Sequence, residues 1–103
     1  MLAEIAVTPI DKTQEGFSTY VAQSIKMIKA SGLAYVMTPM GTIIEGSADD
    51  VFDLIKAVHK NMASQSDRVS TSIKIDDRKG VLDALSGKIK SVEAALGENV
   101  KKV

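Results

Sequence analysis

Apolar and polar positions along this chain form one pattern twice: an apolar strand, an amphipathic helix and a second strand. Strict alternation marks the strands, and apolar positions three or four residues apart mark the helices. The first copy covers residues 3–10, 17–30 and 33–38, and the second covers residues 41–45, 48–63 and 69–76. The pattern therefore predicts two consecutive β-α-β units.

The ends of these elements carry recognisable signals. Pro9 closes the first strand where its missing N–H is tolerated, and Gly32 suits the left-handed residue that ends a helix. Ser47, three residues before Asp50, resembles a capping box at the start of the second helix. The predicted core stripes of the two helices are Phe17, Val21, Ile25 and Ile28, and Val51, Ile55, Val58 and Met62.

Two further segments complete the prediction. Residues 38–42, Thr-Pro-Met-Gly-Thr, combine a fixed proline dihedral with a flexible glycine and predict a hairpin that joins the two copies. After residue 80 a third helix is predicted from one apolar stripe, formed by Leu82, Leu85, Ile89, Val92 and Leu96.

Two β-α-β units with right-handed crossovers predict an α+β, ferredoxin-like sandwich over residues 1–103. Its antiparallel sheet has the strand order 4-1-3-2, and the third helix is an addition at the C-terminus. If the helices cover the face with Ile5, Val7, Ile73 and Ile75, the other face carries Glu4, Ala6, Thr8, Ser70, Ser72 and Lys74, completed by either Ile43 and Glu45 or Thr42 and Ile44. Such a mixed face predicts a homo-oligomer, formed across this face or along a sheet edge.

Composition narrows the possible functions. With 103 residues and 45% apolar content, the chain has enough material for one domain and one core. Thirteen basic and thirteen acidic residues cancel, so no overall field favours nucleic acid or an anionic membrane. Zero cysteines exclude a disulfide scaffold and a thiolate nucleophile. The first residues show no leader pattern and no apolar run is long enough to span a membrane, so a cytoplasmic protein is expected.

Three blocks carry a resemblance to a known family. They are residues 3–5, Ala-Glu-Ile; the hairpin at 38–42 with Ile44, Glu45 and Gly46 behind it; and residues 73–78, Ile-Lys-Ile-Asp-Asp-Arg. Over residues 2–96 the chain resembles the small YkoF-like thiamine-binding proteins, long catalogued as an uncharacterised family. The resemblance implies a ferredoxin-like fold, dimers or tetramers built through sheet faces and edges, and binding of thiamine or its hydroxymethylpyrimidine moiety without conversion. Gly16 departs from the family pattern, where a helix-capping serine is common, and Ser18 is its expected substitute.

An aminopyrimidine needs a hydrogen-bond acceptor, a donor and a flat apolar surface. Glu45 is the predicted acceptor for its amino group, and Gly41 is expected to let main-chain groups approach it. The hydroxyl groups are assigned to Thr38, Thr42 and Ser72, the packing to Tyr20 and Met40, and Thr8, Ser18 and Lys74 complete the predicted site. This places the site at the open sheet face, beside a subunit interface, and Glu45→Gln is expected to weaken binding.

Each assignment has a plainer alternative. Lys74 is as readily a structural ion pair with Glu4 or Glu45, the hairpin can simply be a good turn, and His59 is given no role. No metal or cofactor is expected, because Asp76 and Asp77 beside Arg78 form a solvated, neutralised turn. No nucleophile and base, phosphate loop or paired catalytic carboxylates are recognisable, so a non-catalytic binder is favoured over an enzyme. The remaining alternative is an ACT-like regulatory or scaffolding oligomer that senses another small molecule, such as an amino acid.

Overall fold

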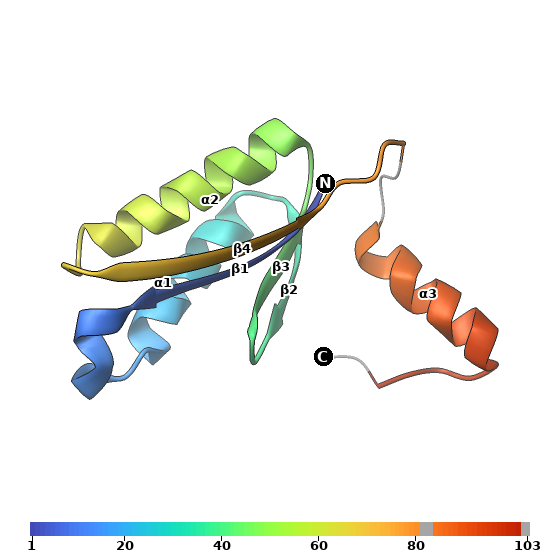
Figure 1. Cartoon of the computed structure of the whole chain (residues 1–103), viewed down its shortest axis with the longest axis horizontal. Coiled ribbons are helices and arrows are strands. Elements are labelled where there is room, and N and C mark those ends of the chain that lie inside the picture. Colours follow the sequence, from blue (N-terminus) through green and yellow to red (C-terminus); the bar gives the residue numbers. More distant parts are fainter. Residues whose placement is uncertain (81–83, 102–103) are drawn as a thin grey trace.

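The structure, a computed structural model, describes residues 1–80 and 84–101. Its elements are β1 (Leu2–Pro9), a 3₁₀ segment η1 (Ile10–Glu15), α1 (Ser18–Ala30), β2 (Ala34–Thr38), β3 (Gly41–Glu45), α2 (Ala48–Ala63), β4 (Val69–Asp76) and α3 (Ala84–Leu96). The predicted bounds of β3, α2 and β4 are confirmed, and those of β1, α1 and β2 are correct within one residue. Figure 1 shows these elements in chain order.

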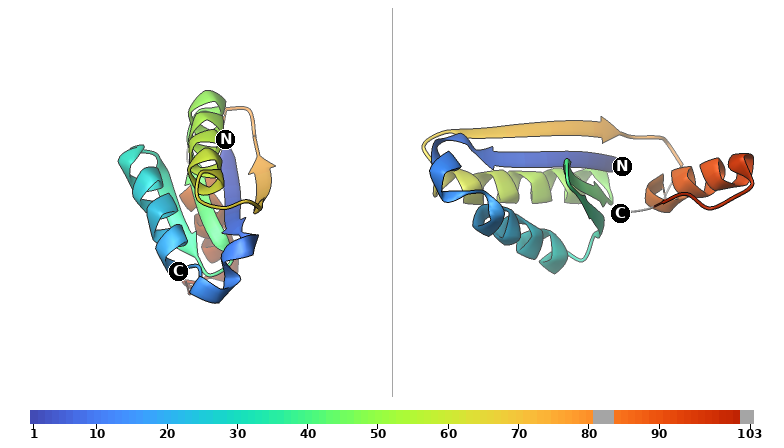
Figure 2. Two further views of the ribbon diagram at one scale, coloured as in Figure 1. Left: turned by 90° about the vertical axis from the view of Figure 1, so that its left-hand side faces the viewer. Right: turned by 90° about the horizontal axis from the view of Figure 1, so that it is seen from below.

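The four strands form one antiparallel sheet with the order β2-β3-β1-β4, which confirms the predicted topology. Figure 2 shows that α1 and α2 both lie on one side of this sheet. The chain therefore has the expected ferredoxin-like arrangement of an antiparallel sheet covered by two crossover helices.

The strand register determines which residues share a face. Ile5 on the central strand lies opposite Thr42 on β3 and Ile73 on β4, and this row faces the helices. Glu4 lies opposite Ile43 and Lys74, so the open face is completed by Ile43 and Glu45 rather than by Thr42 and Ile44. The buried apolar core consists of Ala3, Ile5, Ile28, Ile44, Val51, Leu54, Ile55, Val58 and Met62.

The capping signals in the sequence form as predicted. The Asp50 N–H donates to Ser47 Oγ at 3.1 Å, and Gly32 has a φ of +77° just after α1. Phe17 differs from its prediction, because it is the N-cap residue of α1 and its side chain stays 38% exposed. The core stripe of α1 therefore begins one turn later, at Val21.

The 3₁₀ segment η1 was not predicted, and contacts distant in sequence stabilise it. The Ile10 N–H donates to the Arg68 carbonyl at 2.9 Å, continuing the β1–β4 ladder beyond Pro9. The Asp11 carboxylate then accepts hydrogen bonds from the Ser66 hydroxyl and from the Asp67 N–H, the latter at 2.9 Å. These bonds hold the start of the β1–α1 connection against the loop before β4.

The third helix lies beyond the end of the sheet instead of covering a face (Figures 1 and 2). A hydrogen bond links it to the sandwich, in which the Leu85 N–H donates to Glu45 Oε2 at 3.3 Å. Of its predicted apolar stripe, Val92 and Leu96 are more than half exposed, and Leu82 falls outside the described residues. Within residues 1–80 and 84–101, no helix has the length and apolar character that crossing a membrane requires.

Candidate functional site

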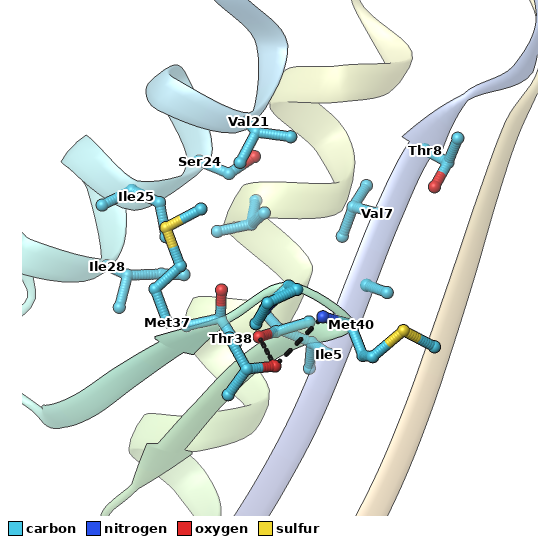
Figure 3. A pocket seen from close by; sticks show the side chains of 15 residues that line it. Ile5, Val7, Thr8, Val21, Ser24, Ile25, Ile28, Met37, Thr38 and Met40 are labelled. Atoms are coloured by element: carbon cyan, nitrogen blue, oxygen red, sulfur yellow. Dashed lines mark hydrogen bonds between the residues drawn. The ribbon is translucent and has the colours of Figure 1, made fainter. Parts of the chain in front are cut away.

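A pocket of about 260 Å³ lies on the helix side of the sheet, between β1, the β2–β3 hairpin, α1 and α2. Figure 3 shows side chains from these elements pointing into one space, with Val21, Ser24 and Ile25 above and the hairpin below. Among the residues that the structure describes, those that line this pocket, hereafter the hairpin pocket, include no charged side chain. Its polar side chains are the hydroxyls of Thr8, Ser24, Thr38 and Thr42.

Unequal strand lengths create the hairpin pocket. The pairing of β1 with β4 continues to Pro9, opposite Val69, whereas the pairing of β1 with β3 stops at Ile5, opposite Thr42. Residues 6–9 of β1 therefore have no strand beside them on the β3 side. Helix α1 passes over this notch, so the space that a longer hairpin would fill remains open.

The tip of the hairpin is fixed by its own hydrogen bonds. The Thr38 hydroxyl donates to the Gly41 carbonyl at 2.8 Å and accepts from the Met40 N–H at 3.2 Å (Figure 3). A Cβ on Gly41 would lie 2.9 Å from the Ile5 carbonyl oxygen, closer than real Cβ contacts allow. Glycine is therefore needed so that β3 can approach β1 where the pairing ends.

The lining combines an apolar floor with a rim of exposed methionines. Ile5 and Ile28 are buried at its base, while Met37 is 49% exposed and Met40 84% exposed at the hairpin. Methionine side chains are unbranched and polarisable, and they pack well against flat rings of varied shape. The hairpin pocket can therefore hold a small planar, uncharged molecule. The Ser24 and Thr38 hydroxyls already donate to the Tyr20 and Gly41 carbonyls, so they offer such a molecule acceptor oxygens.

Half of the predicted site residues lie together in this pocket. They are Thr8, Thr38, Met40, Gly41 and Thr42. Ser18 and Tyr20 belong to the first turn of α1, whereas Glu45, Ser72 and Lys74 are on the open face. Glu45, the predicted amino-group acceptor, instead accepts the Leu85 N–H of α3. The structure thus brings half of the predicted set to the rim of this pocket and leaves the other half outside it.

Sequence reasoning missed the helical side of the pocket. Val21, Ile25 and Val58 were assigned to core stripes, while Ser24 and Met37 were given no role. The lengths of the strands were the signal in the sequence that could have indicated the pocket. Strands β1 and β4 each have eight residues, whereas β3 has five. A hairpin shorter than the strand it pairs with leaves unpaired strand under the crossover helix.

The open face carries a second, shallower hollow of about 190 Å³, lined by Leu2, Glu4, Ile43, Lys74 and Asp76. Glu4 and Lys74 lie opposite each other in the sheet, but no ion pair joins them in the described residues. Lys74 is on β4 and Glu45 is on β3, and strand β1 lies between them in the sheet. The structural pairings expected for Lys74 are therefore not formed.

Comparison with known proteins shows relatives over most of the chain. Residues 3–93 match the family model described as thiamine-binding protein. The UPF0045 protein YqgV of Bacillus subtilis is 37% identical over 100 residues, which cover 92% of this chain and 96% of the relative. The hypothetical protein MJ1052 of Methanocaldococcus jannaschii superposes with a TM-score of 0.80 at 32% identity, covering 88% of this chain and 93% of that one. A candidate thiamine biosynthesis/salvage protein of Thermotoga maritima has the same fold, with a TM-score of 0.75, 21% identity and coverage of 88% and 96%.

Proposed function

The chain belongs to the thiamine-binding protein family, and on that premise we propose that it binds the hydroxymethylpyrimidine moiety of thiamine in the hairpin pocket without converting it. The observation that carries this proposal is a small pocket with hydroxyl groups and no charged lining side chain. Such a pocket suits a neutral, polar ring.

Volume and charge both favour the pyrimidine over intact thiamine. Ligand pockets commonly enclose roughly 300–1,000 Å³, so about 260 Å³ is at the small end and suits one ring better than two. The thiazolium ring of thiamine is a cation, and burying a cation without a paired anion is costly. The same absence of charge in the lining disfavours an amino-acid zwitterion, which needs a partner for each of its charges.

Binding without chemistry is the simpler account of this lining. Among the described residues, its side-chain functional groups are hydroxyls and methionine thioethers, with no general base in the lining. His59, the one histidine in the sequence, is on α2 and bonds through Nδ1 to the Thr71 hydroxyl at 2.6 Å, outside the pocket. A carrier or storage role in the cytoplasm follows from this proposal, with no further cofactor required.

The proposal includes assembly of the chain into a dimer or tetramer. The apolar residues Val92 and Leu96 on α3 and Ile73 and Ile75 on β4 are between 39% and 56% exposed, and β4 is an edge strand. Exposed apolar surface next to unpaired strand edges favours association with a second copy. Light scattering of the purified chain is expected to give a dimer or tetramer mass, and a monomer at micromolar concentration would contradict assembly.

The proposed ligand can be tested by titration calorimetry in phosphate-free buffer. Hydroxymethylpyrimidine is expected to bind saturably, with one site per chain, and thiamine more weakly because of its charge and second ring. Absence of heat with both ligands at millimolar concentration would reject the proposal. Tighter binding of thiamine than of the pyrimidine would reject the preference for a neutral ring.

A further inference from the structure

The central strand β1 pairs with β4 along its whole length but with β3 only as far as Ile5. The direction in which each of its main-chain groups points follows from its hydrogen bonds. At its start the Met1 ammonium donates to the Gly46 carbonyl at 2.8 Å, and the Gly46 N–H donates to the Met1 carbonyl at 3.1 Å. On the other side the Ile10 N–H donates to the Arg68 carbonyl of the β4 side. In an antiparallel sheet the main-chain groups of successive residues point to alternate neighbours. Odd-numbered residues of β1 therefore point toward β3, and even-numbered ones toward β4.

This alternation leaves the Val7 main chain without a hydrogen-bonding partner on the β3 side. Val7 is odd-numbered, so its N–H and C=O point toward β3, but the pairing with β3 has already ended at Ile5. Continuing the register would place Met40 opposite Val7, and Met40 lies in the turn with its N–H bonded to the Thr38 hydroxyl. Among the described residues, no hydrogen bond to the Val7 main chain is formed on this side.

Both unpaired groups belong to a residue that lines the hairpin pocket (Figure 3). Val7 as a whole residue is half-buried, and its main chain lies beside the partly enclosed space of the pocket. Main-chain groups that are shut off from bulk water are normally paired in native proteins, and an unpaired donor and acceptor beside a cavity can be satisfied by a ligand that enters it. The pocket thus contains a polar hydrogen-bonding element made of main-chain atoms, the N–H and C=O of Val7, in addition to its side chains.

We propose that the Val7 N–H and C=O bind the edge of a planar heterocycle that carries an amino group next to a ring nitrogen. The N–H donates to the ring nitrogen, and the amino group donates to the C=O. The ligand thereby takes the place of the missing β3 residue, which would exchange the same two hydrogen bonds with Val7. The amino group of hydroxymethylpyrimidine is adjacent to such a nitrogen, so this inference rests on the proposed function and specifies how its site reads the ring.

This arrangement accounts for a pocket that selects a polar ring without a charged side chain. A main-chain donor and acceptor on a central strand are held in place by the β4 pairing on the opposite side, where Val7 lies opposite Thr71. They need no side-chain ordering when the ligand arrives, which lowers the entropic cost of binding. They also make recognition insensitive to the identity of the side chain at position 7.

Amide hydrogen exchange tests the contact directly, with the full chain, hydroxymethylpyrimidine as probe and ¹⁵N-resolved NMR as readout. At saturation the exchange rate of the Val7 amide is expected to fall at least about tenfold, because the ligand supplies its missing acceptor. Ile5 and Ala6 are internal controls, since their amides are already paired with β3 and β4. Calorimetric saturation without any change at Val7 would overturn this inference and leave the proposed function intact, whereas absence of binding would reject the proposed function itself.

A ligand analogue provides a second readout that requires no mutation. Replacing the amino group by a carbonyl oxygen converts the donor to an acceptor and places hydrogen on the adjacent nitrogen, so both contacts to Val7 become repulsive. Its affinity is expected to fall at least about tenfold, because sites built on hydrogen bonds reject mismatched analogues strongly. Equal affinity for the two rings would contradict main-chain recognition by Val7.

Discussion

At the scale of single residues, Gly41 is the position on which the hairpin pocket depends most. A side chain there would meet the Ile5 carbonyl at 2.9 Å, so β3 and β1 could not keep their present separation. Gly41→Ala is expected to destabilise the fold by about 1–3 kcal/mol and to weaken pyrimidine binding. Urea unfolding and calorimetry measure the two effects.

Gly87→Ala is the matched control, because it makes the same change where a Cβ meets nothing within 4 Å. Gly87 lies inside α3, where alanine is the better helix former by about 1 kcal/mol. This variant is expected to be as stable as the parent or more so, with unchanged affinity. If Gly41→Ala behaved in the same way, the close approach of β3 to β1 would not matter for the pocket.

Asp11 predicts an acid-dependent contribution to stability. Hydrogen bonds from the Ser66 hydroxyl, and next from the Asp67 N–H, lower the pKa of Asp11 below its ordinary value of 3.8. A lowered folded-state pKa means that the ionised form stabilises the fold above the ordinary pKa. That contribution is lost as the pH falls below about 4 and through the lowered value.

The corresponding measurement is urea unfolding of the parent and of Asp11→Asn between pH 7 and pH 3. The parent is expected to be more stable by a constant margin at neutral pH, and this margin should shrink as the pH falls below about 4. Asp53→Asn changes an exposed carboxylate on α2 and serves as the comparison. A margin that stayed constant down to pH 3 would contradict the role assigned to the Asp11 carboxylate.

At the scale of elements, the role of Glu45 distinguishes the site predicted from the sequence, which includes this residue, from the hairpin pocket, which does not. The sequence predicts that Glu45→Gln weakens binding, because the carboxylate would accept the ligand amino group. In the structure this side chain accepts the Leu85 N–H at the start of α3 and lies outside the hairpin pocket. A carboxylate at a helix N-terminus contributes about 0.3–1 kcal/mol through the helix dipole.

Glu45→Gln is therefore expected to leave pyrimidine affinity unchanged and to loosen the first turn of α3. Calorimetry measures the affinity, and exchange of the Leu85 amide reports the helix start. An affinity loss of about tenfold, equal to 1.4 kcal/mol, would return Glu45 to the binding site.

The elements themselves were predictable because their signals are local. Alternation identified β4, the stripe of α2 identified its whole length, and Ser47 and Gly32 marked helix ends. The 3₁₀ segment was missed because Asp11 is hydrogen-bonded to Ser66 and Asp67, which lie 55 and 56 positions further along the sequence. Long-range hydrogen bonds of this kind leave no periodic signal in the segment that they order.

At the scale of the whole molecule, the fold was predictable but the position of the pocket was not. Two β-α-β units permit few topologies, and the handedness of their crossovers selects the observed strand order. The pocket, by contrast, depends on how far β1 continues beyond the hairpin and on α1 passing over the gap. Five of the predicted site residues line this pocket because they belong to that hairpin or to β1, and their role in binding stays a prediction.

The shape of the molecule also separates the proposed binding pocket from the proposed assembly surface on α3. The chain measures 47 × 28 × 21 Å, and its long dimension includes α3 beyond the end of the sheet (Figure 1). The hairpin pocket lies between the sheet and the helices, whereas α3 extends from the opposite end of β3. Variants that fill the pocket are therefore expected to leave the mass of the assembly unchanged.

The central claim, that the ligand occupies the hairpin pocket, is tested most directly by blocking that pocket from α1. Ser24 points into it, whereas Ala22 is exposed on the same helix, so Ser24→Leu and Ala22→Leu add similar bulk in different places (Figure 3). The measurement is calorimetric titration of both variants with hydroxymethylpyrimidine. Loss of saturable binding in Ser24→Leu with parental affinity in Ala22→Leu is the predicted result. Parental affinity in a folded Ser24→Leu variant would contradict the account and place the ligand elsewhere.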